Sequence, residues 1–240
     1  MSASRAGRGH RHAEAEHLEN TGSGILRASI FGVSDGLVSN LALVMGVVGG
    51  TQSVDAVVLA GSAGLLAGAF SMAAGEYVSM TTQRETMEQQ LHLEREHLDA
   101  YPEEEEAHLA DLLAEGGLES KVARDMARKI HEKTDHALDF HALLELGIVP
   151  RQMGAPIAAA AASFAAFVAG AAIPLIPWLL TERALPASIV LSAAALLVVG
   201  GAVTRLTGRS MWAGALRQLV VGGAAATVTF GVGRLIGAVL

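Results

Sequence analysis

Apolar residues in this chain are gathered into long, nearly unbroken blocks instead of following the spacing of an amphipathic helix. A helix needs roughly 20 predominantly apolar residues to cross the hydrocarbon core of a bilayer. Five blocks reach about this length: residues 25–50, 54–80, 153–180, 186–203 and 211–240. The sequence has no polar faces that would cover five such helices in a soluble fold. The pattern therefore predicts an all-α, polytopic membrane protein with five transmembrane helices.

A polar stretch, residues 81–150, separates the second apolar block from the third and has the pattern of a small helical domain. Its first part is rich in strong helix formers and should continue the second transmembrane helix beyond the bilayer. Pro102 precedes four glutamates, and acidic residues in a first turn complement the helix dipole. Gly116 and Gly117 favour the end of that helix. Two more helices are expected, at about 119–133 and 135–146.

Composition supports this division and shows where the charge lies. Hydrophobic residues make up 51% of the 240 positions and charged residues 17%, below the quarter or so that is usual for soluble domains. The stretch 81–150 holds 17 of the 24 acidic residues and six of the nine histidines. We therefore expect four regions: an N-terminal tail (1–24), transmembrane helices 1 and 2 (25–80), a helical domain (81–150) and transmembrane helices 3 to 5 (151–240).

Several functional classes are excluded by residue types that the sequence lacks. Without cysteine there is no disulfide, no thiolate metal site and no cysteine nucleophile. No basic stripe of the kind that binds nucleic acid is present. The first 24 residues have no apolar core, so we expect no cleavable signal peptide.

Lysine and arginine predict the orientation in the membrane, because cytoplasmic loops carry an excess of both. Four arginines lie in or just after the N-terminal tail, and eight Lys and Arg residues lie in the stretch 81–151. The loops on the opposite side carry only Arg183. We therefore expect a multi-pass protein of the cytoplasmic membrane, with the tail and the 81–150 domain in the cytoplasm and the C-terminus outside.

Only two carboxylates, Asp35 and Glu76, lie deep in the apolar blocks. An ionisable group inside a bilayer costs several kcal/mol and is a functional-site hypothesis by default. Met72, Glu76 and Met80 are spaced i, i+4, i+8 and share one helix face. Carboxylate and thioether together suit a borderline ion such as Fe²⁺ better than Ca²⁺ or Mg²⁺. The alternatives are that the methionines only pack and that Glu76 lies at the cytoplasmic end, outside the hydrocarbon.

The helical domain carries three acid–histidine pairs at helical spacing. Pairs three residues apart also present the ligands of di-iron carboxylate bundles. The alternative is that these acid-rich helices are solvated faces without a metal. The pairs are Glu94 with His97, Glu105 with His108, and His141 with Glu145. The histidines of the tail, His10, His12 and His17, are either further ligands or part of a disordered tail, which we favour.

Several sequence blocks resemble the vacuolar iron transporter family of divalent-metal/proton antiporters, in its prokaryotic form. The resemblance covers about residues 25–240 and is most specific in the first two spans. The matching blocks are FGVSDGLVSNLALVMGVVGG, GAFSMAAGEYVSM, FHALLELGI, SFAAFVAGAAIPLIP and RQLVVGGAAATVTFGVGRLIG.

The resemblance implies a homodimer in which the first two helices line the translocation path and a cytoplasmic domain gathers the metal. The family's pathway aspartate and methionine fall on Asp35 and Met72. Its cytoplasmic ligands match Glu94, Glu105 and Glu145 but are replaced by histidine at three positions: His97, His108 and His141. Imidazole still binds iron and related ions, and its protonation would make loading sensitive to pH.

We therefore expect a transporter that exports a divalent transition metal, Fe²⁺ first, in exchange for protons. It would not be an enzyme, and it would hold no permanent cofactor. Mn²⁺, Co²⁺ and Zn²⁺ are alternative cargoes, and the expected partners are metal ions, protons, the lipid bilayer and a second copy of the chain. Two alternatives are a membrane-anchored metal sensor or buffer and a ferritin-like ferroxidase.

Overall fold

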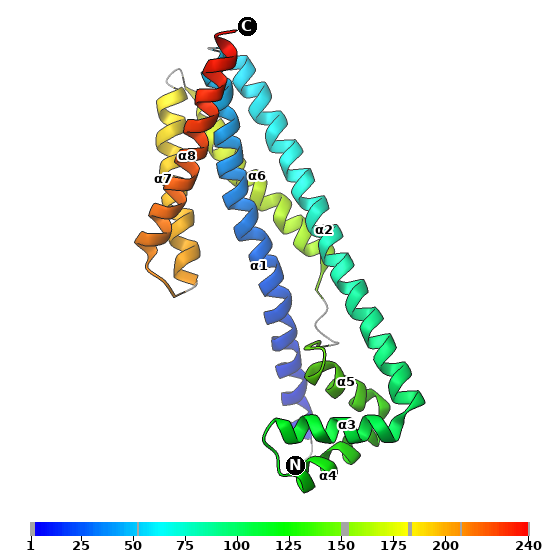
Figure 1. The fold of residues 1–240 in the computed structure, drawn as a ribbon. Helices are drawn as coiled ribbons and strands as arrows, with labels where there is room; N and C mark the ends of the chain where they lie inside the picture. The colour runs from blue at the N-terminus through cyan, green and yellow to red at the C-terminus, as the bar shows by residue number, and fades with distance from the viewer. Residues whose placement is uncertain (1–2, 52, 150–153, 182–183, 207, 240) are drawn as a thin grey trace. The chain divides into compact units, whose positions relative to one another are not determined.

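The computed structural model describes residues 3–51, 53–149, 154–181, 184–206 and 208–239. All secondary structure in these ranges is α-helical, which confirms the predicted fold class (Figure 1). The helices are α1 (Ala3–Gly50), α2 (Val54–Ala100), α3 (Pro102–Glu115), α4 (Ser120–His131), α5 (Thr134–Leu144), α6 (Pro156–Leu180), α7 (Ala184–Leu206) and α8 (Met211–Gly237).

Five of these helices are long and apolar enough to cross a membrane, as the hydrophobic blocks predicted: parts of α1 and α2, together with α6, α7 and α8. Many of their large apolar side chains point outward. Leu59 is 74% exposed, Phe70 65% and Val190 69%. Such a surface would be unfavourable in water but is suited to lipid tails. The chain is therefore a polytopic membrane protein.

The chain divides into two compact units. The membrane unit contains residues 22–78 and 156–240, and the second unit contains residues 1–21 and 79–155. Helix α1 begins at Ala3, so the backbone of the N-terminal segment is helical where we favoured a disordered tail. Its alanines, glutamates and arginines are good helix formers, and it has no proline to break the helix. The side chains of His10, His12 and His17 lie outside the described part of the structure.

Glycines allow the helices of the membrane unit to approach closely. A Cβ atom at Gly36 of α1 would collide with the backbone carbonyl of Phe167 in α6, and one at Gly170 of α6 with that of Val33 in α1. Small residues permit such crossings in membranes, where van der Waals packing drives association. Helix α6 passes close to α1 and places Phe167 beside the functional part of α1.

The second unit is built from the end of α2 with α3, α4 and α5. Leu98 of α2 joins Leu109, Ala127 and Leu138 in one apolar core, so the three short helices are anchored on α2. Helix α3 begins at the expected proline, with glutamates in its first turn. It ends at Gly116, and Gly117 follows with φ of 100°, a backbone conformation that glycine adopts readily.

Candidate metal centre and membrane cavity

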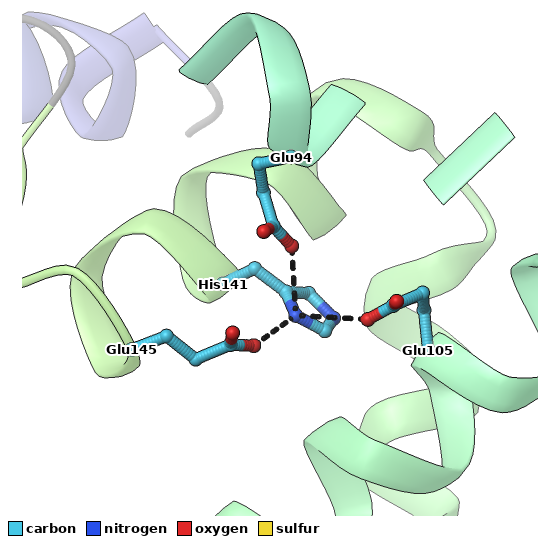
Figure 2. Close-up of side chains that lie close together, drawn as sticks. All are labelled: Glu94, Glu105, His141 and Glu145. Atoms are coloured by element: carbon cyan, nitrogen blue, oxygen red, sulfur yellow. Dashed lines mark hydrogen bonds and ion pairs between the residues drawn. The ribbon is translucent and has the colours of Figure 1, made fainter. Parts of the chain in front are cut away.

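Four side chains from three helices meet in the second unit. Glu94 comes from α2, Glu105 from α3, and His141 and Glu145 from α5 and its C-terminal cap. One potential ligand atom from each lies within 4.8 Å of all the others. The Nδ1 atom of His141 lies at the centre, with the three carboxylates directed toward it (Figure 2). Its distances to carboxylate oxygens are 2.5 Å for Glu145, 3.2 Å for Glu94 and 3.8 Å for Glu105.

This cluster is buried on one side and open on the other. His141 has no exposed surface and Glu94 is 8% exposed, whereas Glu145 lies at the surface. Burial disfavours the charged form of Glu94, and the nearby carboxylates of Glu145 and Glu105 add repulsion, so its pKa lies above the ordinary value of a glutamate. His141 and His97 act in the opposite direction. A dication bound here would relieve the repulsion among the three carboxylates.

The donor set is suited to a transition metal. Carboxylate oxygen and imidazole nitrogen are ligands that Fe²⁺, Mn²⁺, Co²⁺ and Zn²⁺ accept. The residues come from three helices, so this set depends on the folded unit. On these grounds the cluster is the candidate metal centre of the chain.

The structure separates the three predicted acid–histidine pairs. His141 and Glu145 both join the centre, but His97 and His108 are exposed. The Nε2 atom of His108 lies 3.4 Å from a carboxylate oxygen of Glu145, at the edge of the cluster. His97 is close enough to Glu94 to affect its pKa but is not a member of the cluster.

His131 of α4 is a neighbour of the centre that the sequence analysis missed. Its ring meets that of His141 edge to face, with centroids 5.3 Å apart. Its Nδ1 atom lies 3.1 Å from the carbonyl oxygen of Ala127. No spacing rule relates His131 to His141, because they lie on different helices. Only the packing of α4 against α5 brings the two rings together.

The membrane unit contains a second candidate site. Asp35 of α1 and Met72 of α2 both line a cavity of about 220 Å³, together with Ser39, Asn40, Leu43, Gly64, Gly68, Ser71 and Phe167. Asp35 is partly buried, and Ser39 and Ser71 are exposed on the protomer surface. The cavity therefore combines a carboxylate, a thioether and several neutral oxygens.

Glu76 and Met80 do not line this cavity. The carboxylate of Glu76 lies 3.2 Å from the guanidinium of Arg27 on α1, and the two groups form an ion pair. Met80 is 9% exposed, and its methyl group lies against Gly154. Met80 therefore packs within the second unit and Glu76 has a charge partner, and the pathway role predicted for both stays a prediction.

These features define a polytopic membrane protein with a carboxylate–imidazole cluster outside its membrane unit and a carboxylate–thioether cavity within it. The model of the VIT family matches residues 26–234, and the chain belongs to this family. Members are transporters and not enzymes, so the chain is a metal-ion transporter, as we expected.

Three similar proteins cover nearly the whole chain. The chain is 36% identical over 224 residues to the vacuolar iron transporter of Acanthamoeba castellanii, covering 92% of this chain and 82% of that protein. It is 30% identical over 226 residues to vacuolar iron transporter 2 of Oryza sativa subsp. japonica, covering 92% of each. It is 31% identical over 228 residues to vacuolar iron transporter 1 of Arabidopsis thaliana, covering 94% and 90%. These relatives are eukaryotic and do not support the expectation of a prokaryotic member.

Proposed function

We propose that this chain exports a divalent transition metal, Fe²⁺ first, from the cytoplasm in exchange for protons. The observation that carries the proposal is the presence of two unlike sites in one chain. The first is the cluster of Glu94, Glu105, His141 and Glu145, and the second is the cavity that contains Asp35 and Met72. A sensor would need the first site alone, whereas a transporter also needs a place for the ion within the membrane.

The cluster would capture the ion. Three carboxylates around one imidazole attract a dication strongly, and the exposed Glu145 provides an entrance from water. His108 at the edge and His97 beyond it would assist as peripheral ligands or as local charges. His141 is one of the three positions at which this chain departs from the ligands that the family resemblance implies, and imidazole still binds iron and related ions.

The membrane cavity would hold the ion during transfer. Asp35 supplies one negative charge, and the thioether of Met72 is a softer ligand that favours a borderline ion. Protonation of the Asp35 carboxylate would release the ion and carry a proton in the opposite direction. A dication with one carboxylate ligand is held weakly enough to leave, which transport requires.

The direction follows from the proposed topology. The excess of Lys and Arg around the 81–150 domain favours a cytoplasmic location for the capture cluster. We propose the cytoplasmic membrane as the location. The names of the relatives refer to a vacuole, and in a vacuolar membrane the domain would also face the cytoplasm. Membrane fractionation with antibodies against the two termini tests both the location and the topology.

We also propose that the active form is a homodimer joined along α1 and α2. Ser39 and Ser71 line the cavity and are exposed on the protomer surface, where lipid tails would leave their hydroxyl groups without hydrogen-bond partners from outside. A second copy would enclose the cavity and cover exposed apolar side chains of α2 such as Leu66. Light scattering of the purified protein in detergent would give a monomeric mass if this proposal is wrong.

The decisive test is flux through proteoliposomes with an imposed pH gradient, measured for Fe²⁺, Mn²⁺, Co²⁺ and Zn²⁺. We expect metal movement that depends on the gradient and is lost in Asp35→Ala. The same variant should still bind metal at the cluster. Wild-type protein that binds metal but moves none would favour the membrane-anchored sensor or buffer.

A further inference from the structure

Asn40 of α1 is a polar side chain buried within the membrane unit, with 2% of its surface exposed. Its Nδ2 atom donates a hydrogen bond of 2.6 Å to the backbone carbonyl of Ala171 in α6. Only the NH₂ end of an amide can donate to a carbonyl, so this bond determines the orientation of the side chain. The oxygen, Oδ1, is directed away from that carbonyl.

Oδ1 of Asn40 has no hydrogen-bond partner among the described residues, although it is fully buried. Leaving a buried acceptor unpaired is unfavourable, and in a bilayer no water from the hydrocarbon can compensate. A buried polar atom without a partner needs an explanation, and at a residue that lines a cavity this can be a group that binds there during function.

The surroundings of Oδ1 show where such a group would lie. Asn40 lines the same cavity as Asp35 and Met72. On the facing helix α2, a Cβ atom at Gly64 would lie 3.4 Å from Oδ1. Because Gly64 has no side chain and itself lines the cavity, α2 places no side-chain atom beside this oxygen at that position.

We propose that Oδ1 of Asn40 is a ligand of the transported cation, completing a site with the carboxylate of Asp35 and the thioether of Met72. This inference rests on the proposed function and adds to it a third ligand that neither the sequence spacing nor the family resemblance assigned. An amide oxygen replaces part of the hydration shell of a divalent ion. It adds no charge, so the ion can still leave when Asp35 is protonated.

Three variants separate a ligand role from a structural one. Asn40→Leu removes the oxygen and the bond to Ala171. Gly64→Ala keeps Asn40 and that bond but covers Oδ1 with a methyl group, and only the flexible end of Leu43 must shift to accommodate it. Asn40→Asp keeps the oxygen and adds a charge, but an ionised carboxylate cannot donate, so this variant also loses the bond to Ala171. Each is reconstituted at full length, and initial rates of Mn²⁺ flux are measured against Mn²⁺ concentration.

We expect Asn40→Leu and Gly64→Ala to raise the KM for Mn²⁺ by about tenfold, the effect of losing one bond to a charged group. Asn40→Asp should lower both KM and the maximal rate, because a second carboxylate holds the ion more tightly. In Gly64→Ala the bond to Ala171 remains, but Gly64 and Leu43 themselves line the cavity, so an effect of this variant supports the ligand role only together with the effects of Asn40→Leu and Asn40→Asp.

Two control variants lie elsewhere in the membrane unit. Gly231→Ala on α8 places its methyl group where nothing lies within 4 Å. Ser192→Ala on α7 removes a buried hydroxyl that has no hydrogen-bond partner among the described residues and does not line the cavity. Both should retain the wild-type KM, and all variants should bind Mn²⁺ at the cluster with wild-type affinity, which shows that the second unit is folded in each.

The outcomes distinguish this inference from the proposed function. Normal wild-type flux with KM values for Asn40→Leu and Gly64→Ala within about twofold of wild type would overturn the ligand role of Asn40 alone. No flux in the wild-type protein would overturn the proposed function and the ligand role together.

Discussion

The capture cluster and the membrane cavity are both candidate cation sites, but they are built differently. The cluster places three carboxylates around one imidazole, with ligand atoms within 4.8 Å of one another. The cavity has one carboxylate, Asp35, and otherwise neutral groups from Met72, Asn40 and two serines. In the cluster, contact with water through Glu145 makes dense charge tolerable. In a bilayer each additional uncompensated charge is costly, so neutral ligands replace charged ones.

The difference also suggests that the two sites have different functions, capture of the ion and its transfer. A site that gathers scarce ions benefits from high charge and tight binding, whereas a site that passes ions onward must release them. If the comparison is correct, substitutions in the cavity should abolish movement and leave binding intact. Substitutions in the cluster should weaken binding and reduce movement only at low metal concentration. The predictions below test this separation.

The largest effect is expected for Asp35→Asn, which keeps the shape of the side chain but removes its charge. The cavity would lose the one carboxylate among its described lining residues, and flux should fall by about 100-fold or more, as when one member of a buried charge pair is removed. Metal binding at the cluster, measured by calorimetry on the same protein, should be unchanged. A parallel loss of binding would show that the two sites are not independent.

Glu94→Gln should have the next largest effect, on binding instead of maximal flux. Replacing the buried carboxylate by an amide lowers the negative charge at the centre, and we expect Mn²⁺ affinity to fall by about 10- to 100-fold. Flux at saturating metal should recover toward the wild-type rate. Glu88→Gln, an exposed position paired with Arg84 on the same helix, provides a matched control that should bind normally.

The raised pKa of Glu94 predicts how the stability of the metal-free second unit depends on pH. The pKa of Glu94 in the folded state lies above its ordinary value of 4.5, so protonation favours the folded state. The stabilising contribution is complete below about pH 4.5 and is lost as the pH rises through the folded-state pKa. Hydrogen exchange across α3 to α5, corrected for intrinsic rates, should show protection falling over this range. In Glu94→Gln the stability of the unit should no longer depend on this ionisation. Bound metal should offset the loss of stability that ionisation of Glu94 causes in the metal-free protein.

Glu76→Gln should have a small effect, because Glu76 is paired with the exposed Arg27 and does not line the cavity. Ion pairs with an exposed partner contribute about 0–1 kcal/mol, so we expect flux to change by no more than about fivefold. A loss comparable with that of Asp35→Asn would restore Glu76 to the transport pathway suggested by its helical spacing with Met72.

The smallest effect is expected for Met80→Leu. Met80 is buried against Gly154, and a swap that nearly conserves volume usually costs less than about 1.5 kcal/mol. Flux and metal selectivity should remain at wild-type values. Met72→Leu is the matched comparison, because it removes the thioether that lines the cavity and should alter the preference between Fe²⁺ and Mn²⁺. Equal effects of the two substitutions would contradict the assignment.

Features that depend on local periodicity could be predicted from the sequence. The five spans follow from the length of the apolar blocks, and the continuation of α2 to Ala100 follows from its helix-forming residues. Pro102 and Gly116 mark the ends of α3 as expected, because their backbone preferences act over one or two residues. Helical spacing also placed His141 and Glu145 on one face, and both join the cluster.

Relations between helices could not be predicted in this way. The spacing rule treats Glu94 with His97 and Glu105 with His108 as equivalent pairs, yet only the glutamates point into the cluster. The rotation of each helix about its axis selects one member, and that rotation is set by the apolar core around Leu109 and Leu138. Periodicity likewise grouped Met72, Glu76 and Met80, although only Met72 lines the cavity.

Residue order alone thus determined that this is a helical membrane protein, that its charge is concentrated in residues 81–150, and which side chains there are of types that can bind a metal. The length of an apolar block and the helical period are properties of a single segment. They can be recognised without knowing which other segment it packs against. Tertiary packing decided which of those residues meet, brought His131 against His141, and placed Asn40 beside the cavity that contains Asp35. These arrangements depend on the close crossing of α1 with α6 and on the seating of α3 to α5 against α2, which are contacts between segments far apart in the chain.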